Sequence, residues 1–130
     1  MNRKKLIIKI KQNDTPALPL SLAVQYGSLI FLSGTVSTDL ETGEPLLGTV
    51  EFETERIIKN IETILEAAGS SLDCVLKTQV FLTDISYFQK MNEVYRIYFP
   101  QDQPARSTVG IKLAGDYKLE IEAVAYVPES

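Results

Sequence analysis

The chain has 130 residues, 45% hydrophobic and 23% charged, which is typical of a single globular domain, here residues 1–130. A net charge of −4 argues against nucleic acid as a partner, because phosphate binding needs clustered basic residues. With one cysteine and no histidine, an internal disulfide and His-dependent catalysis are excluded, and no metal site is expected. No apolar run suits a membrane span or a signal peptide, so we expect no membrane partner and a cytosolic location.

The N-terminal part predicts three strands. The first is KLIIKIK (5–11), and PALPLS (16–21) then breaks the pattern because proline cannot occupy the middle of a central strand. LAVQYGSLIFLSG (22–34) predicts two strands joined by a tight turn, in which Gly27 can adopt a positive φ. A polar loop follows in DLETGEP (39–45).

The clearest helix is EFETERIIKNIETILEAAG (51–69), with aliphatic residues at helical spacing and Gly69 as its stop. SLDCVLKTQVFLTD (71–84) then predicts a strand. One face of that strand is expected to carry Leu72, Cys74, Leu76, Val80 and Leu82. Within this apolar stripe, Cys74 is interpreted as a buried structural thiol rather than a nucleophile.

A second helix is predicted over SYFQKMNEVYRIYFP (86–100). Ser86 and Gln89 fit a capping box at its start, and Pro100 ends it. Its apolar stripe, interpreted as core rather than ligand-binding, comprises Phe88, Met91, Val94, Tyr95 and Tyr98. Two closing strands are expected around residues 106–113 and 117–127.

The predicted order is β-β-β-α-β-α-β-β, an α+β fold in which two helices cover only one face of the sheet. Strand parity assigns the uncovered face of the last strand to Glu120, Glu122, Val124 and Tyr126. Carboxylates mixed with bulky apolar groups suit a subunit interface with a polar cleft. We therefore expect a homo-oligomer.

Arg106, in PARST (104–108), is the first candidate for chemistry. A guanidinium presents a rigid fork of donors that matches a carboxylate, and neighbouring hydroxyls and backbone N–H groups could complete a seat for a small acid. A surface arginine in a loop explains this local pattern at least as well.

Glu120 and Glu122 are the second candidate, because neighbouring carboxylates on one strand face can raise one another's pKa toward neutrality. Two solvated glutamates, or glutamates paired with lysines such as Lys77, are the alternative. Ser33 and Gly34 end a predicted strand where a ligand could approach the backbone, although Ser-Gly is often only a turn.

Taken together, these stretches resemble the RidA/YjgF family of imine and enamine deaminases. PARSTV and KLEIEAVA resemble its C-terminal signature, and IFLSG, TGE, ILEAAGSSLDCVLKTQVFLTD and FQKMNEVYRIYF match other landmarks in order. The resemblance implies a chorismate-mutase-like fold, a mixed sheet with two helices on one face. It also implies a homotrimer whose sheets form a central barrel, with a ligand cleft at each interface.

The resemblance further implies hydrolysis of reactive 2-imino (2-enamino) acids to 2-keto acids and ammonia, with no cofactor. Arg106 matches the family arginine that clamps the substrate carboxylate, and Glu120 matches the glutamate that orients or activates water. Thr108 occupies a position commonly held by cysteine, where backbone groups contact ligand. The other residues that match pocket-lining positions are Ser33, Gly34, Phe88 and Asn92.

One departure from the family pattern bears directly on the candidate site. The family usually has Gly-Pro-Tyr before the second strand, whereas LPLSLAV places Leu20 where that tyrosine belongs. A leucine offers no hydroxyl and makes that wall apolar, which motivates a preference for apolar substrates. It also motivates an alternative, a non-catalytic module that binds small carboxylates or regulates a partner. A ribonuclease or translation inhibitor, a label some members carry, is disfavoured by the acidic composition and the absence of histidine.

Overall fold

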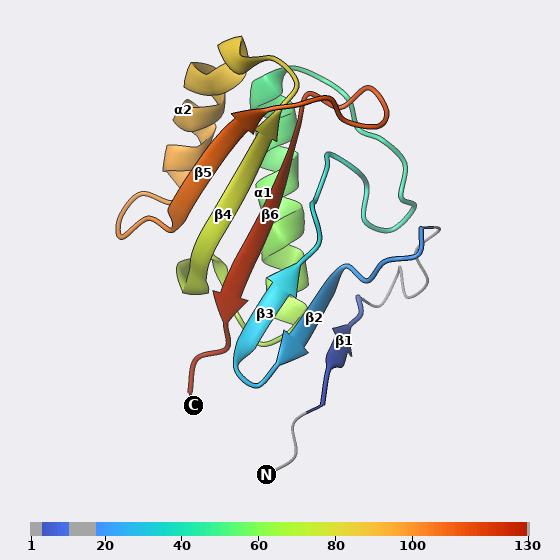
Figure 1. Ribbon diagram of the computed structural model, residues 1–130, viewed down its shortest axis with the longest axis vertical. Coiled ribbons are helices and arrows are strands. Elements are labelled where there is room, and N and C mark those ends of the chain that lie inside the picture. The colour runs from blue at the N-terminus through green and yellow to red at the C-terminus, as the bar shows by residue number, and fades with distance from the viewer. Residues whose placement is uncertain (1–3, 11–17, 130) are drawn as a thin grey trace.

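The computed structural model describes residues 4–10 and 18–129, and Lys11, Pro16 and Ala17 of the predicted N-terminal segments lie outside them. One six-stranded sheet has the order β1-β2-β3-β6-β4-β5, with two helices packed behind it (Figure 1). All neighbouring strands are antiparallel except β4 and β5. The strands are β1 (Leu6–Ile8), β2 (Ala23–Tyr26), β3 (Leu29–Leu32), β4 (Val75–Leu82), β5 (Ala105–Gly110) and β6 (Leu119–Tyr126).

The two predicted helices are confirmed as α1 (Val50–Ala67) and α2 (Phe88–Tyr98), and both cover the same face of the sheet (Figure 1). Thr49 caps α1 by accepting a hydrogen bond from the backbone N–H of Phe52, and Gly69 follows the helix with a φ of 80°. The core between helices and sheet is aliphatic and includes Ile30, Ile57, Ile58, Ile61, Val80, Leu82, Leu119 and Ile121.

The start of the predicted strand at 71–84 is wrong. Leu72–Cys74 form a 3₁₀ helix, and a bulge between Val75 and Lys77 shifts the pairing of β4 with β6. Leu76, expected in the buried stripe, is 46% exposed as a result, whereas Cys74 is buried as expected. An alternation rule assumes an unbroken strand, so one extra residue moves the side chains that precede it to the other face.

The predicted capping box is also wrong. The side chain of Asp84 accepts the backbone N–H of Ser86 at 2.9 Å, and this interaction begins a short 3₁₀ turn, Ile85–Tyr87. Helix α2 starts after that turn, at Phe88, with no side-chain hydrogen bond at its cap. In the predicted capping box the Gln89 side chain would accept the backbone N–H of Ser86, whereas the side chain of Asp84, two residues upstream, accepts it instead.

The open face of the sheet, on the side away from the helices, is apolar over much of its area. Parity on β6 is confirmed: Leu119, Ile121, Ala123 and Ala125 are buried under the helices, and their neighbours face the open side. The exposed apolar side chains of this open face are Ile7, Tyr26, Leu29, Phe31, Val109 and Tyr126. Among the described residues, no helix has both the length and the apolar composition that a membrane span requires.

Candidate functional site

Arg106 lies on β5, the edge strand, and points toward the helices. It pairs with Thr78 of β4, whose side chain is buried on the helix-covered face. The guanidinium carbon of Arg106 lies 4.7 Å from the ring centroid of Tyr95 and 5.7 Å from that of Phe88. Two aromatic faces supplied by α2 therefore hold the guanidinium by cation–π interaction.

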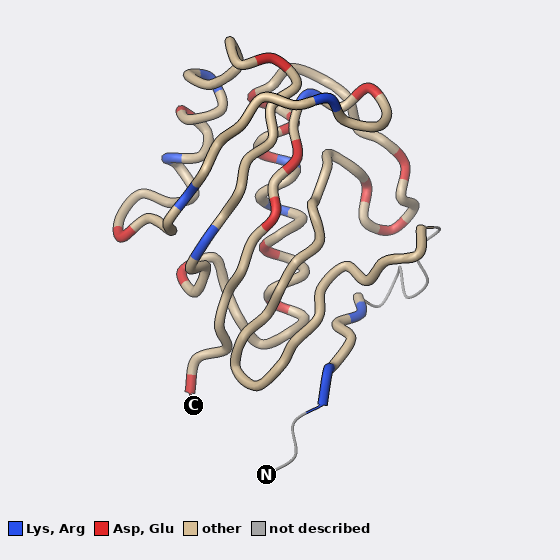
Figure 2. The backbone as a smooth tube through the Cα atoms, in the orientation of Figure 1, with Lys and Arg blue, Asp and Glu red and all other residues tan. Residues whose placement is uncertain are grey.

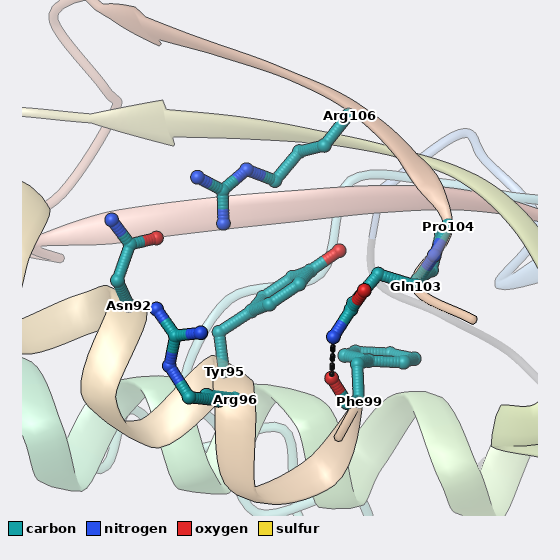
Figure 3. Close-up of a pocket in the computed structure, with 7 residues that line it drawn as sticks. All are labelled: Asn92, Tyr95, Arg96, Phe99, Gln103, Pro104 and Arg106. Carbon is teal, nitrogen blue, oxygen red and sulfur yellow. Dashed lines mark hydrogen bonds between the residues drawn. The ribbon is translucent and has the colours of Figure 1, made fainter. Parts of the chain in front are cut away.

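A pocket of about 260 Å³ lies between β5 and α2, with Arg106 on its wall. Helical spacing explains which α2 residues reach it, since Asn92, Arg96 and Phe99 recur every three or four positions. Figure 3 shows the guanidinium groups of Arg106 and Arg96 approaching the same space, with the amide of Asn92 beside them. The pocket thus offers hydrogen-bond donors and two positive charges to a small anion.

Tyr95 supports this pocket from below. Its hydroxyl lies 2.8 Å from the hydroxyl of Thr78, in a buried hydrogen bond that ties α2 to the sheet. Burial raises the pKa of Tyr95, and the hydrogen bond with Thr78 and the charge of Arg106 partly oppose this. The phenol therefore stays neutral, and its ring presents a fixed face to the guanidinium.

Glu120 and Glu122 lie on β6 and face the open side of the sheet, where Figure 2 shows acidic positions near its middle. Both side chains are half-buried. Burial raises the pKa of Glu120, and the neighbouring charge of Glu122 raises it further. In the part of the chain that the structure describes, Lys77 forms no ion pair within 4.0 Å with either Glu120 or Glu122, so the lysine-paired alternative is not supported. The direction of the pKa shift of Glu120 agrees with the prediction.

Gly34 lets Glu120 lie close to the backbone. Between the pairs Phe31–Val124 and Thr35–Ile121, three residues on one strand face two on the other, so Gly34 falls in a bulge. A Cβ atom on Gly34 would overlap the Glu120 carboxyl group, at 2.6 Å from its carbon. The glycine predicted to admit a ligand thus first of all admits this carboxylate.

The other predicted site residues are spread over the chain. The Ser33 hydroxyl donates to the backbone carbonyl of Ser21 at 2.6 Å, so in this arrangement its proton is not free to donate to a ligand. Thr108 is half-buried and pairs with Val80 on the helix-covered face. Leu20 is 44% exposed and precedes β2, a strand separated from β5 by β3, β6 and β4. Phe88 and Asn92, in contrast, do lie beside Arg106.

Arg106 and Glu120 of one chain cannot contact the same small molecule. They lie on opposite faces of the sheet, two strands apart, and their β4 partners Thr78 and Phe81 are three residues apart. Standard strand dimensions then separate their Cα atoms by about 14 Å. The predicted site residues therefore form two separate groups in one chain, one around Arg106 and one around Glu120 and Gly34.

Sequence reasoning missed Tyr95, Arg96 and Gln103 as parts of the pocket. Tyr95 was assigned to the core by its apolar spacing, and it is indeed 5% exposed, yet its ring also supports Arg106. Arg96 follows Asn92 by one helical turn, a spacing that could have signalled it. Within residues 4–10 and 18–129, no three His, Cys, Asp or Glu side chains cluster closely enough to hold a metal ion.

A family model described as Endoribonuclease L-PSP matches residues 11–127 of the chain. The chain belongs to the RidA/YjgF family. This member is 43% identical over 123 residues to a RutC family protein of Pyrococcus abyssi, an alignment that covers 94% of this chain and 97% of that protein. It is 32% identical to the 2-iminobutanoate/2-iminopropanoate deaminase of Dermatophagoides farinae, with 95% of this chain and 97% of the relative covered.

The fold of this RidA/YjgF chain also matches solved structures. The crystal structure of E. coli TdcF with bound serine is 35% identical, covers 92% of this chain and 97% of the other, and superposes with a TM-score of 0.83. The α+β architecture that the resemblance implied is therefore confirmed. Of these similar proteins, E. coli TdcF was crystallised with bound serine, and the relative from Dermatophagoides farinae carries the name of an imine deaminase.

Proposed function

We propose that this protein hydrolyses 2-imino and 2-enamino acids to 2-keto acids and ammonia, in clefts between the subunits of a homotrimer and without a cofactor. The observation that carries the proposal is the Arg106 guanidinium, fixed on the rings of Tyr95 and Phe88 with its edge toward a pocket. Every 2-imino acid has a carboxylate next to the reacting carbon, and a bidentate guanidinium is suited to hold it.

Glu120 supplies the second element of the proposed site. A protonated imine is hydrolysed when water attacks C2: a C–O bond forms and the C=N π electrons move to nitrogen. The C–N bond then breaks as the hydroxyl oxygen forms the keto C=O bond, and ammonia and the hydroxyl proton leave. A carboxylate with a raised pKa can accept the water's proton and return it to the departing nitrogen. The chemistry therefore needs a positioned water and one proton carrier, which Glu120 can provide without histidine.

Assembly is required because the two halves lie on opposite faces of one chain. The open face carries exposed Leu29, Phe31, Val109 and Tyr126, a patch that is costly to leave in water and suited to contact between copies. If the open face of one subunit packs against the β5 edge of its neighbour, the Glu120–Gly34 half of the first can meet the Arg106 half of the second. The homotrimer and the cytosolic location expected from the sequence stay parts of this proposal.

The test generates a 2-imino acid in place with an amino-acid oxidase and follows release of the 2-keto acid. Wild type should accelerate hydrolysis, and Arg106→Ala should lose at least about tenfold in kcat/KM, because one charge-assisted pair is removed. Lys112→Ala serves as control, since it removes a positive charge from an exposed position beyond β5. If wild type is no faster than Arg106→Ala, the deaminase proposal is lost.

A second candidate is a non-catalytic module that binds small carboxylates. It is favoured by Leu20, an exposed leucine where the family has a tyrosine, because that position offers no hydroxyl to a substrate or a water. Calorimetry separates the two functions: binding of 2-ketobutyrate through Arg106 without any turnover would support the module. RNA cleavage, named in the description of the family model, is less suited to a chain of net charge −4.

A further inference from the structure

The pocket beside Arg106 contains a second arginine that a monocarboxylic substrate would not use. Arg96 lines the same pocket from α2, one helical turn after Asn92, and its side chain points into the space that Arg106 also faces (Figure 3). A 2-imino acid with an apolar side chain needs one cation, for its single carboxylate. The second guanidinium therefore calls for a second anionic group on the ligand.

Neither guanidinium is neutralised by the protein. Among the described residues, no carboxylate lies within 4.0 Å of the side-chain nitrogens of Arg96 or Arg106, and the pocket lining contains no acid. Glu93 precedes Arg96 by three positions on α2, but no ion pair joins them. Two uncompensated positive charges in one pocket repel each other, and a dianion would relieve that repulsion.

The amide side chains of the pocket, Gln103 and Asn92, carry no charge that could balance an anionic group on the ligand. The Gln103 amide donates to the backbone carbonyls of Phe99 and Pro100, at 3.2 and 3.1 Å, and so fastens the loop at one end of the pocket. Asn92 is neutral and lies beside both guanidinium groups in Figure 3, where it can donate to or accept from a ligand oxygen. A volume of about 260 Å³ accommodates a small dicarboxylic acid together with ordered water.

We propose that the Arg106 pocket takes a dicarboxylic 2-imino or 2-keto acid, with Arg106 on the carboxylate next to C2 and Arg96 on the distal carboxylate. This inference rests on the proposed function for the orientation of the ligand and deepens it by naming the class of side chain. Arg96 is then the specificity-determining residue, and an acidic side chain is preferred over the apolar one that Leu20 suggested.

Calorimetry on the full chain tests the inference, with 2-ketoglutarate and 2-ketobutyrate as probes. We expect wild type to bind 2-ketoglutarate about two- to fivefold more tightly than 2-ketobutyrate, the contribution of one ion pair at an exposed guanidinium. Arg96→Gln should bring the ratio of the two affinities close to one. Lys90→Gln removes a positive charge from an exposed position on the same helix and should preserve the ratio, which controls for long-range electrostatics.

A parallel kinetic measurement compares 2-iminoglutarate and 2-iminobutyrate, each generated by the matching amino-acid oxidase. If neither imine is hydrolysed faster, the proposed deaminase function fails, and the calorimetric ratio still decides the inference. Equal affinity of wild type for both keto acids overturns the dicarboxylate assignment. An affinity ratio that Arg96→Gln leaves unchanged, or that Lys90→Gln lowers equally, overturns the role of Arg96.

Discussion

The support of Arg106 by Tyr95 yields a prediction that separates the hydroxyl of this tyrosine from its ring. Tyr95→Phe removes the hydroxyl that lies 2.8 Å from Thr78 and leaves the ring under the guanidinium. Thr78 is 1% exposed, so its own hydroxyl loses its partner without gaining water. The expected loss in the free energy of unfolding is about 1–3 kcal/mol, the usual cost of a buried unsatisfied polar group.

Tyr95→Leu removes the ring as well. A cation 4.7 Å from a ring centroid gains about 0.5–2 kcal/mol, so 2-ketobutyrate should bind about 2- to 30-fold more weakly than to wild type, and more weakly than to Tyr95→Phe. Affinity is measured by calorimetry, and stability by urea denaturation.

The matched control is the double variant Thr78→Val with Tyr95→Phe, which removes both hydroxyls. It should lose about 1 kcal/mol less stability than the sum of the two single variants, because no polar group is left unpaired. Simple additivity would refute the hydrogen bond. Tyr95→Leu binding as tightly as Tyr95→Phe would refute the role of the ring.

Three further predictions concern the open face and the backbone of Lys118, the residue before β6. Glu122→Gln should lower the pKa of Glu120, because it removes a neighbouring negative charge. Since a base must be deprotonated, the acid limb of the kcat/KM profile should then move to lower pH. An unmoved limb would exclude Glu120 as that base. Glu53→Gln should cost about 1–3 kcal/mol in urea denaturation, because the fully buried carboxylate accepts two backbone N–H groups at 2.9 and 3.1 Å. Gly34→Ala should displace the Glu120 carboxyl group and lower kcat/KM about 10- to 100-fold. The control Gly110→Ala should leave kcat/KM unchanged, because its added Cβ lies 3.9 Å from the nearest atom. Equal rates in the two variants would contradict the close approach of Gly34 and Glu120.

The sequence predicted those elements whose periodicity is unbroken. Helix α1 and strand β6 were placed to within a few residues, since each has an apolar stripe of a single period. The bulge after Val75 and the 3₁₀ turn at Leu72–Cys74 were not predicted, because both interrupt the apolar period of the segment. The position of the bulge depends on the pairing of β4 with β6, which the local sequence does not specify.

The members of the candidate site could be chosen from the sequence, but their relative positions could not. The faces to which Arg106 and Glu120 point follow from the register of β5 on β4 and of β6 on β4, and tertiary packing sets both. The sequence therefore indicated a carboxylate clamp and a proton carrier without showing that they lie on opposite faces. That separation is why we infer a site shared between subunits.

Mixed assembly of two inactive variants tests this central inference most directly. Arg106→Ala and Glu120→Gln chains, denatured together and refolded in equal amounts, should recover imine hydrolysis, although each variant refolded alone stays inactive. Random association in a symmetric ring places an intact arginine beside an intact glutamate in about one quarter of the sites, so about a quarter of wild-type activity is expected. No recovery from a mixture shown to contain both chains in one oligomer would contradict a site built from two subunits.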